Sequence, residues 1–183
     1  RRARVREVPR QDIPIYQGEL WTAMQRQASP IHEIAYRACY KPQLPAYFIE
    51  RLTEPGDIVY DPFSGRGTTA VEAALNGRNV IANDVNPLST ILTQPRLELP
   101  ELADIAARLD TLRFKVRQFS DIDLSMFYHR ETERELLALR TYLMSRQADY
   151  KEDAIDRWIR MVATNRLTGH SPGFFSVYTL PPN

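Results

Sequence analysis

Residues 57–84 read DIVYDPFSGRGTTAVEAALNGRNVIAND, and this stretch decides the fold class. The β-branched and aromatic residues at 57–61 predict a buried strand, and residues 79–84 predict a second strand. Between them, the glycine-containing loop 62–67 leads into a helical run at 68–76. A strand, a glycine loop, a helix and a strand in so short a stretch indicate a βαβ unit, which requires a parallel sheet.

The rest of the chain is expected to form three further parts around this unit. The four predicted parts are an N-terminal arm with a short helix (1–35), the βαβ unit (36–100), a helical insertion (101–170) and a strand that returns to the sheet (171–183). The fold class that follows is α/β with a Rossmann-like sheet, which is incomplete because only about three strands are predicted.

Helical periodicity outside the βαβ unit comes from apolar residues at three- and four-residue steps. It predicts helices at 42–52, 101–118, 130–147 and 152–165. In the last of these helices, Asp156, Arg157 and Arg160 are expected to face outward, because the apolar residues lie on the other side. Pro95 and Pro100 are expected to interrupt the chain before the insertion.

Composition and charge limit the class of protein. The chain has 183 residues, 43% of them hydrophobic, and its 24 basic and 23 acidic residues leave a net charge of +1. This balance is typical of a globular protein and excludes a disordered or fibrous chain. The apolar runs are shorter than the roughly 18 residues that span a bilayer, so we expect no membrane segment and a cytoplasmic location. The single cysteine, Cys39, excludes an internal disulfide, and the isolated histidines indicate no metal site.

Two aspartates indicate the charge of the ligand. Asp61 ends the first predicted strand and Asp84 ends the second, so both lie where such sheets bind ligands. Asp61 would repel a diphosphate, whereas it would attract a ligand that carries sulfonium and ammonium cations. S-Adenosyl-L-methionine carries both cations, and Asp84 would accept hydrogen bonds from its ribose hydroxyls. The pattern Gly65-x-Gly67-x-x-Ala70 also fits a dinucleotide fingerprint, so an NAD-dependent oxidoreductase remains an alternative.

The same residues resemble a known family. Residues 61–69 (DPFSGRGTT), followed by 83–87 (NDVNP), are similar to the cofactor motif of amino-type DNA methyltransferases, which reads D-P-F-x-G-x-G-T-T. Lys41-Pro42 is similar to the segment that precedes this motif in the family. The resemblance implies a methyltransferase sheet and methylation of N6 of adenine or N4 of cytosine in double-stranded DNA, with the target base flipped out, as in restriction-modification. The implied cofactor-binding residues are Lys41, Asp61, Pro62, Phe63, Ser64, Gly65, Gly67, Thr68, Asp84 and Val85.

The family's second motif has only a poor counterpart in this chain. That motif is a polar residue, two prolines and an aromatic residue, which bind the target amine and stack the flipped base. Its nearest counterpart is Leu180-Pro181-Pro182-Asn183, so Pro181, Pro182 and Asn183 are candidates and the catalytic residues are otherwise unassigned. We expect the chain to be a piece of a longer protein, with the motif on the remainder of the parent chain or on a second chain.

A second alternative follows from the incomplete motif set. Five arginines lie in the first ten residues, and arginine binds phosphate groups through bidentate hydrogen bonds. A catalytically silent subunit that binds nucleic acid would also have this composition.

Overall fold

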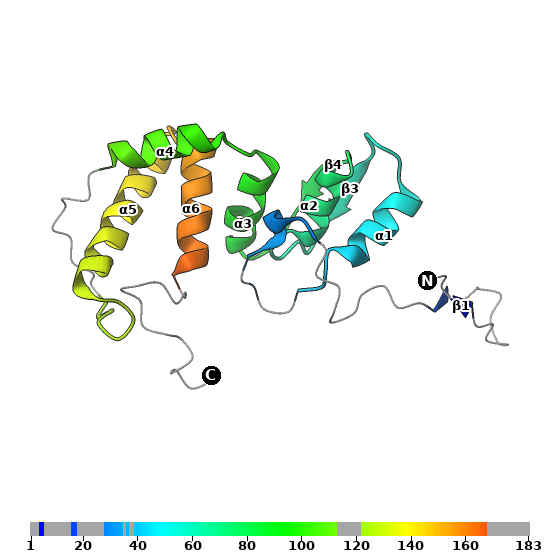
Figure 1. Cartoon of the computed structure of the whole chain (residues 1–183), viewed down its shortest axis with the longest axis horizontal. Helices are drawn as coiled ribbons and strands as arrows, with labels where there is room; N and C mark the ends of the chain where they lie inside the picture. The colour runs from blue at the N-terminus through cyan, green and yellow to red at the C-terminus, as the bar shows by residue number, and fades with distance from the viewer. Residues whose placement is uncertain are drawn as a thin grey trace. The chain divides into compact units, whose positions relative to one another are not determined.

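The computed structural model describes residues 4–5, 16–17, 28–34, 36, 39–112 and 122–167 (Figure 1). The chain separates into two compact units, Arg1–Ser89 and Thr90–Asn183. The first unit contains the parallel sheet, and the described part of the second unit is helical. The molecule is therefore of the α/β class, as the sequence predicts.

The elements of the first unit follow the order that the sequence predicts around the glycine loop. They are β1 (Arg4–Val5), β2 (Tyr16–Gln17), the 3-10 helix η1 (Pro30–His32), α1 (Gln43–Leu52), β3 (Ile58–Asp61), α2 (Thr68–Leu75) and β4 (Asn79–Ala82). β3 and β4 pair in parallel, with Ile58 opposite Asn79 and Asp61 opposite Ala82. The predicted βαβ unit is confirmed. A short antiparallel pair, β1 with β2, lies in the predicted N-terminal arm.

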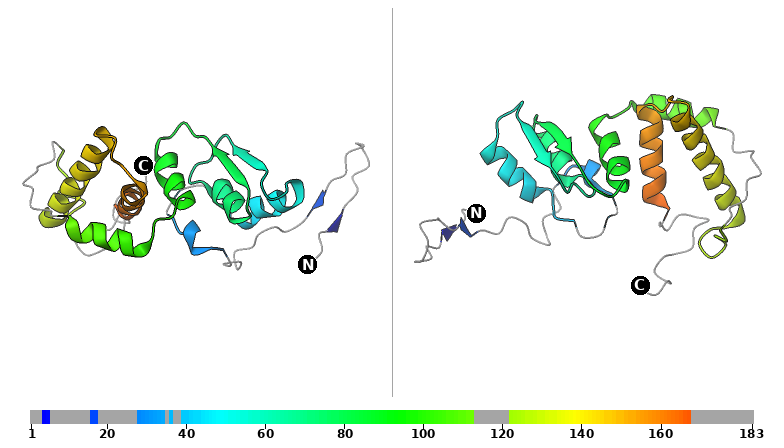
Figure 2. Two further views of the ribbon diagram at one scale, coloured as in Figure 1. Left: turned by 90° about the horizontal axis from the view of Figure 1, so that it is seen from above. Right: turned by 180° about the vertical axis from the view of Figure 1, so that it is seen from behind.

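The core of the first unit lies between α2 and the sheet. Ala70, Val71 and Ala73 are at most 1% exposed, and α2 packs against both strands and against α1 (Figure 2). These small side chains let the helix approach the sheet closely, and their burial removes apolar surface from water.

One face of the sheet is exposed, which corrects the expectation of a buried strand at 57–61. Ile58 and Tyr60 are 64% and 60% exposed, and Ile81 on β4 is 52% exposed. Alternation along each strand and the parallel register put these three side chains on one face. The expectation fails because, within the described part of the unit, that face lacks the covering layer that the apolar pattern assumes.

The described part of the second unit contains four helices. They are α3 (Leu88–Leu97), α4 (Leu102–Thr111), α5 (Arg130–Ala148) and α6 (Ala154–Arg166), with α3 crossing the boundary between the units. Three of them, α4, α5 and α6, confirm predicted helices. Two predictions extend outside the described residues: the end of the 101–118 helix, beyond Leu112, and the strand at the C-terminal end.

The expected break at Pro95 is wrong, because Pro95 lies inside α3 and the helix continues to Leu97. Its burial, together with that of Leu92, offsets the hydrogen bond that a helical proline loses.

Asp156 on α6 is completely buried, so the expectation that it faces outward is wrong. Three donors from other helices reach its carboxylate: Arg108 Nη1 at 2.6 Å, Arg146 Nε at 2.7 Å and the Tyr142 hydroxyl at 2.9 Å. A buried charge is tolerated where partners of this kind satisfy it, and α4 and α5 supply them here. Asp153 and Asp156 also form a capping box at the start of α6.

The other two residues expected to face outward are also partly buried, each in an ion pair. Arg157 Nη2 lies 2.6 Å from Glu98 Oε2, and Arg160 Nη2 lies 2.5 Å from Glu152 Oε1. Among the described helices, none has the length and apolar character needed to cross a membrane.

Candidate functional site

The loops that follow β3 and β4 are joined at the carboxyl edge of the sheet. The Asn83 amide donates to the Asp61 carbonyl, and the Ser64 amide donates to the Asn83 carbonyl, both over 2.9 Å. The Ser64 hydroxyl also lies 2.9 Å from the Ser89 hydroxyl. The loop after one strand is therefore held against the loop after the other, as expected for the ligand-binding edge of a parallel sheet.

The glycine loop turns sharply because two of its residues adopt the left-handed conformation. Gly65 has a φ of +51° and Gly67 a φ of +78°, a region that side-chain-bearing residues rarely adopt. The Gly67 amide donates to the Ser64 carbonyl over 2.6 Å, and Gly67 is the N-cap residue of α2. The chain therefore passes from the turn directly into the helix.

Asp84 binds the glycine loop from the end of β4. Its Oδ2 accepts a hydrogen bond from the Gly65 amide at 2.7 Å, and its Oδ1 accepts one from the Asn86 amide at 2.9 Å. These backbone donors, Asn86 first and Gly65 next, lower the pKa of Asp84 below its usual range. The carboxylate is thus a fixed negative charge beside the loop.

Asp61 has one satisfied and one unsatisfied carboxylate oxygen. Its Oδ1 accepts a hydrogen bond from the Phe63 amide at 3.1 Å. Its Oδ2 is buried and has no hydrogen-bond partner within the described part of the chain. Buried acceptors are nearly always paired in native structures, and leaving one unpaired costs about 1–3 kcal/mol. This oxygen therefore lacks a donor at the edge of the sheet where ligands bind.

The remaining residues named from the sequence fall into two groups. Ser64 and Thr68 are almost fully buried. The Ser64 hydroxyl binds Ser89 and the Asn83 carbonyl, and the Thr68 hydroxyl accepts from Arg66 Nε at 3.1 Å. Phe63 and Val85 are 85% and 100% exposed, so their side chains lie at the rim. Pro62 lies between Asp61 and Phe63, while Lys41 precedes α1, where its carbonyl accepts a bond from Leu44. Pro181, Pro182 and Asn183 lie outside the described residues.

Two residues that the sequence did not place at the site precede α1 and contact α2 and the glycine loop. His32, which the sequence shows as isolated, has its Nε2 atom 2.7 Å from Glu72 Oε1 on α2. The Tyr36 ring lies against Gly65, with Cε1 3.5 Å from the position that a β-carbon on Gly65 would occupy. The pairing of His32 with Glu72 could not be predicted from the sequence, because the two residues are 40 positions apart. The sequence does show a glutamate among the small apolar residues of α2, and this glutamate is a sign of a buried polar contact.

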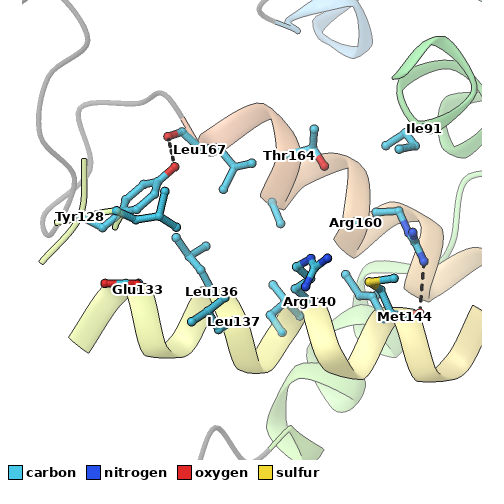
Figure 3. A pocket seen from close by; sticks show the side chains of 14 residues that line it. Ile91, Tyr128, Glu133, Leu136, Leu137, Arg140, Met144, Arg160, Thr164 and Leu167 are labelled. Atoms are coloured by element: carbon cyan, nitrogen blue, oxygen red, sulfur yellow. Dashed lines mark hydrogen bonds between the residues drawn. The ribbon is translucent and has the colours of Figure 1, made fainter. Parts of the chain in front are cut away.

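Two cavities of about 390 Å³ lie away from Asp61 and Asp84, one in each unit. The cavity in the second unit lies between α5 and α6 and is mostly apolar, with Leu136 and Leu137 on its wall (Figure 3). Two of the polar side chains around it bind the protein itself: the Tyr128 hydroxyl donates to the Leu167 carbonyl, and Arg160 donates to the Leu143 carbonyl. The other cavity lies beside α1 and β3 and is lined by side chains such as Phe48 and Ile49. Neither contains convergent polar groups comparable with those at the sheet edge.

The fold and the site together define a class of protein. A parallel βαβ unit has a glycine loop at the carboxyl end of its first strand, and a carboxylate from the end of the next strand binds that loop. This is the arrangement of α/β domains that bind nucleotide-containing ligands.

Comparison with known proteins shows which family part of the chain resembles. A family model for DNA methylases of the N6/N4 type matches residues 6–90. Type II methyltransferase M.MjaII of Methanocaldococcus jannaschii is 33% identical over 85 residues, which are 46% of this chain and 16% of that protein. Type II methyltransferase M.MvaI of Kocuria varians is 28% identical over 128 residues, 68% of this chain and 25% of that protein. A tRNA (guanine(37)-N(1))-methyltransferase of Drosophila pseudoobscura pseudoobscura is 49% identical over 41 residues, 22% of this chain and 9% of that protein. No solved structure matches.

Residues 6–90, just under half of the chain, are therefore similar to DNA methylases of the N6/N4 amino type, a family that uses a methyl donor. The chain spans only 16% to 25% of the two type II methyltransferases. Because the match to M.MvaI covers 68% of the chain, it extends past residue 90 and into the helical unit.

Proposed function

We propose that this chain is the cofactor-binding part of a DNA methyltransferase that transfers the methyl group of S-adenosyl-L-methionine to an exocyclic amine of adenine or cytosine. The observation that carries the proposal is the buried, unpartnered Oδ2 of Asp61 beside the glycine loop. All three relatives are methyltransferases by name, which supports a methyl-donor site in this chain.

The residues at the sheet edge fit this donor. The ammonium group of S-adenosylmethionine would give Asp61 Oδ2 the donor that it lacks, and its sulfonium would be favoured by the same negative charge. Both oxygens of Asp84 accept backbone hydrogen bonds, and the carboxylate still has a lone pair for a ribose hydroxyl. A diphosphate would instead meet two carboxylates, which argues against the NAD-dependent alternative.

The mechanism requires the chain mainly to position the donor. When bound, S-adenosylmethionine supplies an electrophilic methyl group, and the target amine attacks it in line. Asp61 and Asp84 orient the two ends of the donor, and the left-handed turn at Gly65 lets the backbone approach it. Exposed Phe63 and Val85 close the rim of the site. The group that binds the target amine belongs, in this proposal, to the remainder of the parent chain or to a second chain.

The proposal extends to the fold. β3 and β4 are two strands of a larger Rossmann-like sheet, and the exposed face formed by Ile58, Tyr60 and Ile81 is covered in the whole enzyme. A two-stranded parallel sheet with one bare apolar face is marginal on its own, which supports this view. The helical residues then form an insertion in the same enzyme, in agreement with the length of the M.MvaI match.

Two measurements test the proposed function. Calorimetric titration of the 183-residue chain should detect binding of S-adenosylmethionine and of S-adenosylhomocysteine, and no binding of NAD. Binding of NAD alone would overturn the proposal in favour of an oxidoreductase.

Methyl transfer from labelled donor should be measured for the parent protein with DNA and, separately, with RNA. Transfer to DNA supports the proposal, transfer to RNA alone overturns the substrate, and donor binding without transfer indicates the silent subunit.

A further inference from the structure

Four residues that precede α1 contact the glycine loop and α2 one after another; we call them the strap. They are His32, Ile34, Tyr36 and Tyr40. The Ile34 carbonyl accepts a hydrogen bond from Arg66 Nη1 at 3.0 Å, and the Tyr40 hydroxyl lies 2.5 Å from Thr69 Oγ1. All four contacts lie within the first unit, and each connects the strap to the segment that bears the proposed cofactor site.

The buried contact of the strap is the pair formed by His32 and Glu72. The two residues are 5% and 9% exposed, and His32 Nε2 lies 2.7 Å from Glu72 Oε1. A carboxylate only accepts, so the imidazole proton lies on Nε2. The second Glu72 oxygen receives only a long contact, 3.5 Å, from Asn76 Nδ2. Loss of the histidine would therefore leave a buried carboxylate poorly paired, which makes this contact a strong anchor.

Tyr36 is the strap residue that lies on the glycine turn. Its Cε1 and hydroxyl oxygen are 3.5 Å and 3.8 Å from the place where Gly65 would carry a β-carbon. The amide of the same Gly65 binds Asp84. The Tyr36 ring therefore borders the loop that lies between the carboxylates of Asp61 and Asp84, which attract the donor. An aromatic ring also attracts a neighbouring cation.

We propose that His32 and Glu72 are positioning residues of the methyl-donor site, because their buried pair holds the Tyr36 ring against Gly65 as one wall of that site. This inference rests on the proposed function and concerns the same site. In it, the donor contacts Tyr36, whereas His32 and Glu72 act on the donor only through the strap.

The test is calorimetric titration of the 183-residue chain with S-adenosylmethionine, for the wild type and for variants at His32. His32→Leu should weaken binding about tenfold, a typical size for the loss of coupling between contacting residues. His32→Gln keeps a donor near Nε2 and Glu72→Gln keeps an acceptor, so both should stay within about threefold of the wild type. His129→Leu is the matched control, since His129 is exposed in the other unit and should leave affinity unchanged.

A double-mutant cycle separates positioning from a general effect on stability. Each variant is titrated well below its own melting temperature, with folding checked by circular dichroism. Tyr36→Ala should weaken donor binding, and His32→Leu added to Tyr36→Ala should weaken it no further. Additive effects, or full affinity in folded His32→Leu, would overturn the inference while leaving the proposed function intact. Failure of the wild-type chain to bind the donor would instead overturn the proposed function.

Discussion

At the scale of single residues, Asp61 combines two tasks because its two carboxylate oxygens have different surroundings. Oδ1 accepts the Phe63 amide and so shapes the turn after β3, whereas Oδ2 is buried without a partner. The first oxygen stabilises the fold. The second oxygen lowers the stability of the fold, because it is buried without a donor, and a bound cation would remove this penalty. Folding and ligand binding therefore use different atoms of one side chain.

Asp61→Asn should separate these two tasks. The amide oxygen still accepts from Phe63, so the melting temperature should change by no more than about two degrees. The charge is lost, so the affinity for S-adenosylmethionine should fall by about tenfold to a hundredfold, the size expected for a hydrogen bond to a charged group.

Asp57→Asn is the matched control for this prediction. Asp57 is exposed at the other end of the same strand, where its Oδ2 accepts the Glu54 amide at 2.9 Å. Calorimetry should show wild-type affinity for the control. Equal loss in both variants would mean that net charge, and not the Asp61 oxygen, governs binding.

Gly65→Ala should damage both the turn and the site. A side chain in the left-handed region costs about 1–2 kcal/mol, and the new β-carbon would contact the Tyr36 ring. Gly56→Ala carries a similar backbone penalty, since Gly56 has a φ of +93°, but its β-carbon would meet open space. Both variants should melt earlier, measured by circular dichroism, and only Gly65→Ala should lose donor affinity. Normal affinity in folded Gly65→Ala would contradict the proposed place of the donor.

At the scale of elements, α6 depends on its buried aspartate for its packing against α4 and α5. Asp156 is 0% exposed and accepts from Arg108, Tyr142 and Arg146. These donors come from two different helices, so one carboxylate joins three elements. The helical unit is therefore sensitive to a single polar side chain in its interior.

Asp156→Asn should destabilise the helical unit strongly. The amide nitrogen would face guanidinium donors, and two arginines would lose their buried counter-charge, at a cost of about 3–5 kcal/mol. Urea denaturation followed by circular dichroism measures this change. Asp149→Asn, which removes an exposed 3.3 Å ion pair with Lys151, should change stability by less than about 1 kcal/mol. Similar effects of the two substitutions would show that the buried cluster contributes little.

The same cluster makes the helical unit sensitive to acid. Burial raises the pKa of Asp153, but the hydrogen bonds from Arg108 and from the Asp156 amide and the charges of Arg108 and Arg146 together outweigh it, so the pKa lies below its usual value. A carboxyl group with a lowered folded pKa stabilises the fold above its unfolded pKa of about 3.9, and this stabilisation is lost as pH falls through the folded pKa. Thermal melting of Asp153→Asn should therefore depend less on pH below about pH 4 than melting of the wild type. An identical pH dependence of the two proteins would contradict this assignment.

The elements could be predicted from sequence wherever the signal is local. The strand at 57–61, the glycine loop and α2 follow from side-chain type and spacing over a few residues. The burial of Ile58 and Tyr60 could not be predicted, because it depends on whether another layer covers the sheet. The burial of Asp156 depends likewise on donors that α4 and α5 bring to it.

The candidate site follows the same division between local and distant signals. The positions of Asp61 and Asp84 at strand ends follow from the sequence, since each follows a short run of β-branched or aromatic residues with at most two residues between. The unpartnered state of one Asp61 oxygen and the contact of His32 with Glu72 do not, because both depend on distant segments. The site residues named from the sequence remain predictions until a ligand is bound.

At the scale of the whole molecule, the chain separates into two units, of which the first contains the parallel sheet and the second, where described, is helical. The proposed donor site lies wholly in the first unit. The contacts that define the site join β3, β4, α2 and the strap, all before residue 90. The buried aspartate cluster joins α4, α5 and α6, all after residue 90. Ligand binding should therefore stabilise one set of hydrogen bonds without acting directly on the other.

Hydrogen exchange measured by mass spectrometry tests this separation. A ligand at 100 times its Kd adds about 2.7 kcal/mol to the state that binds it, so amides of the first unit that exchange through its unfolding should slow by up to about a hundredfold. The amides of α2 and of the loops after β3 and β4 should show this effect with S-adenosylmethionine, because the donor bridges these loops. Amides in α5 and α6 serve as the internal control and should exchange at unchanged rates. At the same ligand concentration, amides of the first unit in the Asp61→Asn protein should slow by only about twofold to tenfold. Equal slowing in α5 and α6 would mean that the two units unfold together, and slowing confined to them would place the ligand in the apolar cavity of the helical unit.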